Sequence, residues 1–440
     1  MQRLLTNPAA SSALRSLAHR LPARIVYGPP YLTVRTLLDR ADSGEDIAPQ
    51  LSIRLASVLR TAITRVPYYR GLGLGIQPDE IRPENAYEVL SRFPYLEKSA
   101  VMRSPESFVS DAHEIRHLKL VTSGGSTGQG IKLYRDASLR SAEAGFIQHQ
   151  WAKVGYSRSA RVVRMGVEGR KKEDEEPCAR SDDRLLISPY HFNEKWIARI
   201  YEEIAAFKPQ FFHAYPSCFE YLADYMNRSG LRLSGVSGIF LASERVTERQ
   251  LSLTERAFEG VPVVILYGLG ERTNLAWGSL RDGEITYEFE RAYGYSENFR
   301  HDNGAHEIVG TSYWNDVMPL IRYRTQDYGE IRDGVMRNLE GREQEFLVTR
   351  SGARIPGFSI VIDQFTWDYV EVFQVVQKEK GRVEFRIKPR PQYHEGIGDA
   401  ILASHQAKWG DFFDLSLVLT DHIERTPSGK IRHFVVDVPE

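Results

Sequence analysis

The chain has few cysteines and no long apolar run, and these absences exclude several classes of protein. Only Cys178 and Cys218 occur among its 440 residues, too few for a disulfide framework or for a zinc site built from paired CxxC motifs. No apolar run is long enough to cross a bilayer as a helix. This composition favours a reducing, cytoplasmic setting, and we expect no membrane partner.

Net charge is also nearly absent. The 57 Lys and Arg residues are balanced by 58 Asp and Glu residues, which leaves a formal net charge of -1. No overall field would therefore attract nucleic acid or an anionic membrane, so small molecules are the expected partners. Hydrophobic residues make up 42% and charged residues 26%, as in an ordinary globular protein, and the length suits two or three domains.

Acidic residues are missing from the N-terminal region. No Asp or Glu precedes Asp39, whereas the same stretch contains five arginines: Arg3, Arg15, Arg20, Arg24 and Arg35. An Arg-rich, acid-poor start is typical of an organelle transit peptide. The alternative, which we favour, is an amphipathic surface helix from Ser11 to Leu21 that ends at Pro22.

Short apolar segments alternate with helical ones in the middle of the chain. Helices are predicted over residues 31–70, 138–151, 194–207, 217–227 and 247–258, and strands over 161–167, 210–214, 238–241 and 261–266. Such alternation indicates a mostly parallel sheet covered by helices on both faces. More strands are predicted at 284–289, 306–311 and 320–325, and a small α+β unit follows with strands at 370–376 and 383–387 and a helix at 400–409.

We therefore predict an α/β fold with two domains. The large N-terminal domain, residues 1–340, would contain mostly parallel sheets covered by helices plus a β-rich subdomain. The small C-terminal domain, residues 341–440, would be a mobile α+β unit.

A segment rich in glycine and hydroxyl groups lies between predicted strands at 115–121 and 131–134. It consists of Ser123, Gly124, Gly125, Ser126, Thr127, Gly128, Gln129 and Gly130. Glycines let several backbone N–H groups converge on one anion, and the hydroxyls add donors, so a polyphosphate fits. The alternative is a flexible hairpin turn. A Walker loop is excluded, because Gly130 is followed by Ile131 and not by Lys.

Two further segments carry chemistry at the ends of predicted strands. Tyr267 to Glu271 directly follows the apolar strand at 261–266, where ligands bind in open α/β sheets. An aromatic ring there can stack on a base, and a carboxylate can hold Mg²⁺ beside phosphate oxygens. In the second segment, Asp327 is suited to bind ribose hydroxyls. The alternatives are ordinary turns with a surface carboxylate, with Arg322 and Arg324 facing solvent.

Near the C-terminus, residues 425–432 present a single lysine on a turn. Pro427, Ser428 and Gly429 shape that turn just before Lys430. An ammonium held in this way can neutralise charge that develops on an attacked phosphate. The alternative is a solvated basic tail without function.

Taken together and in this order, the four segments resemble motifs of the adenylate-forming superfamily, which includes acyl-CoA synthetases, adenylation domains and luciferases. Within it the chain is most similar to the phenylacetate-CoA ligase and CapK-like branch. Further matching segments are 66–70, 208–209 with 213–217, 318–325, and 341–345 leading to 352–355. The resemblance covers nearly the whole chain, and so many motifs at compatible spacing make a chance match improbable.

The resemblance implies a role for each matching residue. Residues 123–130 would wrap the β- and γ-phosphates of ATP, and Lys430 would bridge the α-phosphate and the substrate carboxylate. Adenine would be contacted by Tyr267, Gly268, Ser243 and Glu244. Asp327 would bind the ribose hydroxyls, and Arg342 would contact ribose or phosphate. Glu271 would help to hold Mg²⁺. Residues His213, Tyr215 and Trp277 fall where the branch builds its acid pocket, which indicates an aromatic or small cyclic acid. The alternative for these three is an ordinary sheet core.

The implied activity is that of an AMP-forming acid ligase that uses ATP and Mg²⁺, with coenzyme A as the expected acceptor. Alternatives are an amine or hydroxyl acceptor, transfer of AMP to a phenolic cofactor, and a nucleotide-binding protein without catalysis. A homodimer is a candidate assembly. Four departures from the family pattern bear on these alternatives: Gly270 replaces a common Thr or Ser, Gly130 replaces a common Pro, Gln326 replaces the usual Gly, and Gln344 replaces a frequent acidic residue at the hinge.

Overall fold

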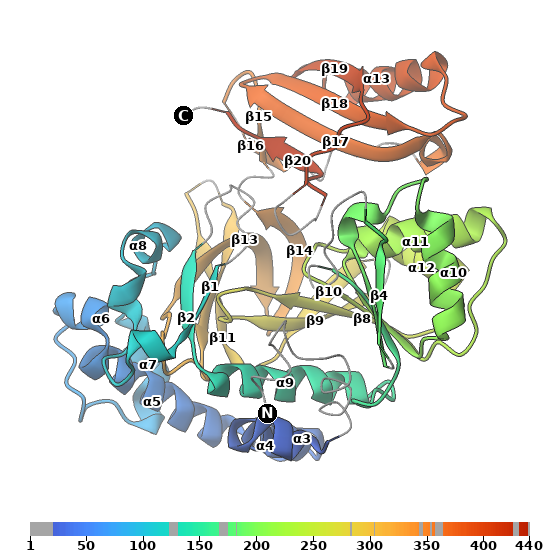
Figure 1. Ribbon diagram of the computed structural model, residues 1–440. Coiled ribbons are helices and arrows are strands. Elements are labelled where there is room, and N and C mark those ends of the chain that lie inside the picture. The colour runs from blue at the N-terminus through green and yellow to red at the C-terminus, as the bar shows by residue number, and fades with distance from the viewer. Residues whose placement is uncertain are drawn as a thin grey trace. The chain divides into compact units, whose positions relative to one another are not determined.

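The computed structural model describes most of the chain (Figure 1). The described residues are 21–122, 131–166, 175–181, 183–281, 284–302, 304–342, 346–352, 354–356, 364–425 and 431–438. They form two compact units. The first contains the described residues up to 325 together with 330–338, and the second contains 326–329 and the described residues from 339 onward. The predicted amphipathic helix at residues 11–21 lies almost wholly outside the described residues.

Helices of the first unit follow the apolar spacing of the sequence. They are α3 (Ala23–Tyr27), α4 (Pro29–Asp42), α5 (Ala48–Arg65), α6 (Pro67–Gly71), α7 (Ala86–Ser91), α8 (Lys98–Arg103), α9 (Ala137–Ala152), α10 (Ile197–Phe207), α11 (Pro216–Arg228) and α12 (Glu248–Ala257). In α5, Leu51, Leu55, Val58 and Leu59 repeat at helical spacing and are all buried. The helix ends before Pro67, whose ring disfavours a helical residue in front of it. The helical pattern at 31–70 thus corresponds to α4, α5 and α6.

None of the helices in the described part of the chain is both long and apolar enough to span a membrane.

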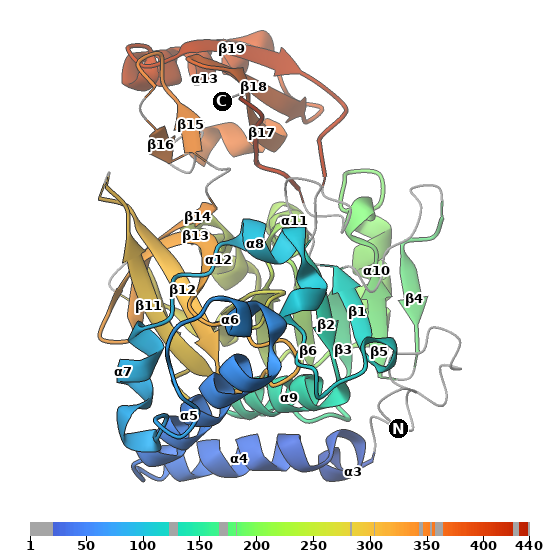
Figure 2. The same ribbon diagram turned by 90° about the vertical axis from the view of Figure 1, so that its left-hand side faces the viewer.

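One twelve-stranded sheet organises the first unit (Figures 1 and 2). Its strand order is β11-β12-β13-β14-β10-β9-β8-β7-β6-β3-β5-β4. The strands are β3 (Val162–Met165), β4 (Cys178–Arg180), β5 (Arg184–Ile187), β6 (Phe211–Ala214), β7 (Gly238–Ala242), β8 (Val263–Gly268), β9 (Leu275–Arg281), β10 (Glu284–Phe289), β11 (Gly294–Arg300), β12 (His306–Ser312), β13 (Tyr323–Arg332) and β14 (Val335–Arg342). Sequence reasoning missed β4, β5, β9, β11 and β14.

The parallel part of this sheet is covered by helices on both faces, as the sequence predicted. Strands β5, β3, β6, β7 and β8 pair in parallel. Consecutive residues of β6 point to opposite faces of the sheet. Phe211 stacks on Phe240, which stacks in turn on Trp151 of α9, whereas Phe212 contacts Phe219 of α11. Strands with both faces buried are expected to be continuously apolar, and all five residues of β7 are buried.

Beyond Gly268 the same sheet becomes antiparallel. The chain reverses after β8, so β9 pairs antiparallel with β8, and β10 pairs antiparallel with β9 and β14. The sequence assigned these strands to a β-rich subdomain beside mostly parallel sheets. In the structure they continue the parallel strands as one sheet, because β9 takes up the open edge of β8.

A separate hairpin carries the glycine-rich segment. Strands β1 (Lys119–Thr122) and β2 (Lys132–Arg135) pair antiparallel, with Val121 opposite Leu133. The predicted strand-to-strand connection through residues 123–130 is therefore confirmed, although these residues lie outside the described ones. The first strand begins later than predicted. Residues 115–117 form a 3-10 turn, in which His117 N donates to Glu114 O and Leu118 N donates to Ile115 O.

In its described residues, the second unit combines a four-stranded sheet and a two-stranded sheet with one α-helix. Its elements are β15 (Phe346–Val348), β16 (Arg354–Pro356), β17 (Val370–Glu379), β18 (Arg382–Pro389), α13 (Glu395–Trp409), β19 (Asp414–Leu419) and β20 (Phe434–Val436). The sheet order is β19-β18-β17-β20, and Phe373, Phe385 and Ile401 are among its buried core residues. Helix α13 begins at Glu395, earlier than the predicted start at residue 400.

Candidate functional site

Two of the predicted motifs meet at the carboxyl end of β8. The strand ends at Gly268, and Glu271 follows three residues later with 9% of its surface exposed. The hydroxyl of Tyr323, at the start of β13, donates a hydrogen bond to Glu271 Oε1 at 3.1 Å. The structure therefore joins the segment that ends in Glu271 to the segment that contains Asp327, at the strand end where ligands bind in α/β sheets.

Two arginines that sequence reasoning missed flank this point. Arg135, the last residue of β2, donates to the carbonyl of Gly270. Arg272 forms an ion pair with Glu143 of α9 and has a positive φ of 58°. Burial and the nearby Arg272 guanidinium lower the pKa of Arg135 to about 10, so Arg135 stays charged at neutral pH. A signal was present in the sequence, because Arg135 ends the strand that follows the glycine-rich segment.

Tyr267 is held by aromatic neighbours on the adjacent strands. Its ring is buried, with 8% exposed, and meets Tyr287 and Phe289 of β10 at centroid distances of 6.2 and 6.1 Å. Both contacts are edge-on, the favoured arrangement for aromatic pairs. The next residue, Gly268, is exposed and carries no side chain. These contacts set the orientation of the Tyr267 ring, and its stacking on adenine stays a prediction.

Ser243 and Glu244 follow β7 and sit beside the start of α11. Ser243 is exposed and has a φ of 75°. Glu244 accepts hydrogen bonds from the backbone N–H of Ser217 at 2.9 Å and from its hydroxyl at 3.1 Å. A carboxylate at a helix N-terminus satisfies unpaired N–H groups and interacts favourably with the helix dipole. Glu244 thus fixes the beginning of α11, a role that the sequence did not reveal.

Asp327 lies inside β13 next to an unusual backbone conformation. Its side chain is buried, with 6% exposed, and the preceding Gln326 has a φ of 62°. That value lies in the left-handed region, where glycine is free of the steric cost that other residues bear. The family pattern usually has glycine at this position, and the conformation supplies a physical reason. The ribose role of Asp327 stays a prediction.

The alternative that Arg322 and Arg324 face solvent is wrong. Arg322 makes two hydrogen bonds to Glu297, at 2.9 and 2.8 Å. Arg324 makes two hydrogen bonds to Glu307, at 2.8 and 2.6 Å, and Glu307 is 1% exposed. The Arg322–Glu297 pair is bidentate and combines charge with fixed geometry. It ties the residue that precedes β13 to β11, whereas the Arg324–Glu307 pair ties β13 to β12.

Two of the predicted acid-pocket residues, His213 and Trp277, border an aromatic cluster that includes Trp151 of α9. The His213 ring meets the ring of Trp151 at 5.0 Å, and Trp277 packs against the cluster of Trp151, Phe211 and Phe240. Burial, together with the nearby Arg164 guanidinium, lowers the pKa of His213 well below its usual range. The imidazole is therefore neutral at neutral pH. Its Nδ1 atom is buried without a hydrogen-bond partner among the described residues.

Tyr215, the third predicted pocket residue, precedes α11 and lies over Gly166. A Cβ atom at position 166 would lie 3.4 Å from the Tyr215 ring, which is an ordinary van der Waals contact, so the ring packs directly against the end of β3. Its ring is 8% exposed.

Several predicted site residues lie outside the described part of the chain. Lys430 and residues 123–130, including the six assigned to phosphate binding, belong to these masked positions, as does Gln344. Arg342 is described only through its backbone, as the last residue of β14. Within the described residues, no group of three or more His, Cys, Asp or Glu side chains could hold a metal ion. Glu271 is still compatible with Mg²⁺, which binds through one or two carboxylates plus substrate phosphates.

The fold defines the class of protein to which the chain is similar. A solved structure of a 2-hydroxyisobutyryl-CoA ligase, in a postadenylation state in complex with R3-HIB-AMP, matches with a TM-score of 0.63 at 16% sequence identity. The match covers 88% of this chain and 89% of that one. At this identity it establishes the fold alone, and that fold is the mixed α/β fold of an adenylate-forming ligase. The predicted fold class is confirmed.

Sequence relatives point to a particular branch. The chain is 23% identical over 279 residues to Protein CapK from Staphylococcus aureus, and the match covers 59% of this chain and 60% of that protein. It is 24% identical over 356 residues to a phenylacetate-coenzyme A ligase from Pseudomonas putida, covering 72% and 75%. No family model matches the sequence. These relatives confirm the resemblance to the phenylacetate-CoA ligase and CapK-like branch of the adenylate-forming superfamily.

Proposed function

We propose that the protein is an AMP-forming ligase that activates a carboxylic acid as an acyl-adenylate and then transfers the acyl group to coenzyme A. The observation that carries this proposal is the hydrogen bond from Tyr323 to Glu271, because it brings the motif proposed for adenine and Mg²⁺ together with the motif proposed for ribose. The acid-CoA ligase among the sequence relatives supports the same chemistry.

The first half-reaction would be attack of the acid's carboxylate on the α-phosphorus of ATP. A new bond forms between carboxylate oxygen and phosphorus, and the bond to the bridging oxygen breaks as pyrophosphate leaves. A carboxylate is a weak nucleophile and must approach a polyanion, so orientation and charge neutralisation provide most of the acceleration. Lys430 would bridge the α-phosphate and the carboxylate during this step.

The remaining site residues would bind and position ATP. Residues 123–130 would hold the β- and γ-phosphates through backbone N–H groups and hydroxyls. Tyr267, with Gly268, Ser243 and Glu244, would contact adenine, while Asp327 would accept hydrogen bonds from ribose and Arg342 would contact ribose or phosphate. Glu271 would hold Mg²⁺, which would offset negative charge on the phosphates. Domain boundaries near residue 340 would let the smaller domain carry Lys430 to and from the site.

The two missed arginines fit this proposal. Arg135 and Arg272 place positive charge beside Gly270 and Glu271, next to the hairpin that contains the glycine-rich segment. Guanidinium groups match phosphate oxygens in geometry as well as charge. We therefore add Arg135 to the residues proposed to stabilise the triphosphate. Its guanidinium would compensate in part for the hydroxyl that Gly270 lacks.

The acid would be aromatic or small and cyclic, bound near His213, Tyr215 and Trp277. The aromatic cluster around Trp151 supports an apolar ring. The Nδ1 of neutral His213, which has no hydrogen-bond partner among the described residues, supports one hydrogen-bonding contact to that acid. A sheet core would more often satisfy such a buried nitrogen.

Product analysis tests the proposal directly. The full-length protein is incubated with ATP, Mg²⁺ and a panel of aromatic, cyclic and aliphatic acids, with coenzyme A, with an amine mixture, or with neither. Mass spectrometry should detect an acyl-adenylate without acceptor and a thioester with coenzyme A. Formation of an amide and no thioester would show that the acceptor is an amine and not coenzyme A, and it would still support the adenylation step. No acyl-adenylate with any acid would reject the proposal.

A further inference from the structure

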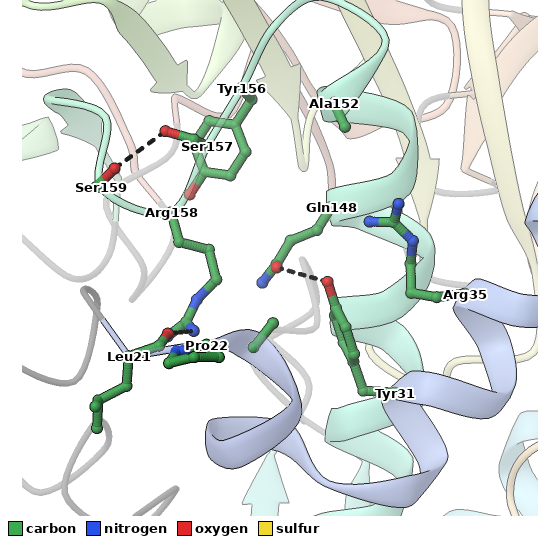
Figure 3. Close-up of a pocket in the computed structure, with 11 residues that line it drawn as sticks. Leu21, Pro22, Tyr31, Arg35, Gln148, Ala152, Tyr156, Ser157, Arg158 and Ser159 are labelled. Carbon is green, nitrogen blue, oxygen red and sulfur yellow. Dashed lines mark hydrogen bonds between the residues drawn. The ribbon is translucent and has the colours of Figure 1, made fainter.

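A cavity of about 320 Å³ lies where α3 and α4 meet the C-terminal end of α9 (Figure 3). Its lining includes Tyr31 and Arg35 of α4, Gln148 of α9, and Tyr156 and Arg158 of the segment that leads into β3. This segment enters β3 at its amino end. Glu271 and His213, in contrast, lie at or near the carboxyl ends of their strands, so the cavity is distinct from the catalytic end of the sheet, and among the described residues the two regions share only the packing of Tyr156 against the aromatic cluster around Trp151.

Positive charge is concentrated in this cavity. Arg35 and Arg158 both line it, and no acidic residue is among the described residues of the lining. Arg35 Nε is buried without a hydrogen-bond partner in the described part of the chain. Asp39 lies outside the lining, with its Oδ1 3.9 Å from Arg35 Nη2, a loose pair with an exposed carboxylate. The Arg35 side chain is 28% exposed and its ion pair is weak, so its charge is available to a ligand in the cavity.

Neighbouring groups add to the positive field. Burial raises the pKa of Tyr156, and the guanidinium groups of Arg184, Arg164 and Arg158 lie close enough to oppose that rise. Neutral donors are also present. Gln148 accepts a hydrogen bond from the Tyr31 hydroxyl at 3.2 Å, which turns its amide nitrogen toward the side of Arg158 in Figure 3. An oxyanion in the cavity could therefore be bound by charged and neutral donors together.

We infer that this cavity binds a small organic anion. Its carboxylate or phosphate group would contact Arg35 and Arg158, and a compact apolar part would lie against the rings of Tyr31 and Tyr156. Guanidinium groups are the preferred partners of planar carboxylates and of phosphates. The volume lies at the small end of the range for ligand pockets, which favours a compact ligand.

The N-terminal segment of the chain does not supply the anion. Residues 1–20 contain Arg3, Arg15 and Arg20 and no Asp or Glu, so they would add positive charge to a cavity that already holds two guanidinium groups. An external ligand is the occupant that balances the charge.

Calorimetric titration of the full-length protein tests the inference with three probes: benzoate, phenyl phosphate and inorganic phosphate. Benzoate or phenyl phosphate should bind, and the probe with the higher affinity shows whether the cavity prefers a carboxylate or a phosphate. Inorganic phosphate should bind more weakly than phenyl phosphate, because it has no apolar part. Arg35→Gln and Arg158→Gln should each weaken the better probe at least about tenfold, the size expected for one charge-assisted hydrogen bond. Melting curves of both variants check that they fold.

Two matched variants locate the effect. Arg24→Gln removes the same charge from an exposed arginine of α3 outside the lining and should bind like the wild type. His213→Gln alters the proposed acid site, where an aromatic acid such as benzoate would also bind, and should leave the binding that depends on Arg35 and Arg158 unchanged, so failure of the proposed function and failure of this inference give different results. If Arg158→Gln does not fold, Arg35→Gln decides alone. Absence of binding by all three probes, or equal binding by wild type and Arg35→Gln, would overturn the inference.

Discussion

Tyr323 donates a hydrogen bond to Glu271 across 3.1 Å and so links two segments that lie 52 residues apart. Tyr323 is fully buried and Glu271 is nearly so, which shields the bond from competing water. Such a bond orients the carboxylate before any ligand arrives, and groups that orient a metal-binding carboxylate affect metal affinity and activity.

Replacing Tyr323 by phenylalanine should therefore weaken the response to Mg²⁺. We expect Tyr323→Phe to raise the Mg²⁺ concentration for half-maximal pyrophosphate release by about 10-fold or more, the usual effect of losing a group that orients a metal ligand. Stability should fall by only about 1 kcal/mol, the net value of one hydrogen bond. The measurement is a Mg²⁺ titration of the initial rate.

A matched control is available for this variant. Tyr87 and Tyr313 share a hydroxyl hydrogen bond at 3.1 Å elsewhere in the first unit. Tyr87→Phe removes a comparable bond and should keep the wild-type Mg²⁺ dependence. If both variants respond to Mg²⁺ as the wild type does, Tyr323 does not position a metal ligand.

Asp327→Ala should raise the apparent KM for ATP and change kcat much less. Ribose contacts are made in the ground state and the transition state alike, so their loss weakens binding without slowing the chemical step. Initial rates at varied ATP concentration measure both constants. Asp302→Ala, at an exposed aspartate, is the control. An unchanged KM would remove Asp327 from the ribose site.

Gln326 offers a test of the backbone conformation beside that aspartate. Because its φ is 62°, Gln326→Gly should melt at a higher temperature than Gln326→Ala, by an amount that corresponds to about 1 kcal/mol. The order should reverse at Arg332, an exposed residue of the same strand, where Ala is favoured over Gly. The same order at both positions would contradict the left-handed conformation of Gln326.

The sequence predicted more of the fold than of the site. Apolar runs and helical periods located the parallel strands and their helices, since burial on both faces leaves a clear pattern, as in β7. Short strands such as β4 could not be located, because three residues carry no usable period. The order of strands in the sheet depends on pairing between distant segments, and no local pattern records that.

Motifs identified the positions that lie at strand ends but not their partners. Glu271 was predicted as a carboxylate beside phosphate, whereas its bond to Tyr323 appears only once β8 and β13 are placed in one sheet. Arg135 was missed for a related reason. A single arginine at the end of a strand is ordinary in sequence, and its closeness to Gly270 depends on the position of the β1–β2 hairpin.

His213 makes stability depend on pH. Its pKa is lowered in the folded protein by burial and by Arg164, so the unfolded chain binds more protons than the folded one as pH falls below about 6.5. The contribution of His213 to the free energy of unfolding is complete above that pH. It declines below it, by at most about 1.4 kcal/mol per pH unit. Buried His149, whose pKa burial also lowers, adds to the same slope.

His213→Gln should therefore reduce the fall in melting temperature between neutral pH and about pH 5.5. Exposed His422→Gln controls for the substitution itself and should retain the wild-type dependence. If His213→Gln and the wild type lose stability in parallel, His213 is not a buried neutral imidazole.

Lys430→Ala tests the proposed division of labour between the two half-reactions. Loss of one preorganised charge-stabilising group should slow adenylation by roughly 10²–10³-fold. Thioester formation from synthetic acyl-adenylate should change much less, because Lys430 would act only while pyrophosphate leaves. Equal loss in both assays would contradict that role.

The central claim is that the protein adenylates an acid, and pyrophosphate release tests it most directly. Wild type and Lys430→Ala are assayed with ATP, Mg²⁺ and each acid of the panel, with coenzyme A, with amines and without acceptor. We predict release that requires one class of acid and Lys430, and that accelerates with coenzyme A. ATP binding without pyrophosphate release for any acid would contradict the account and identify a nucleotide-binding protein that does not catalyse adenylation.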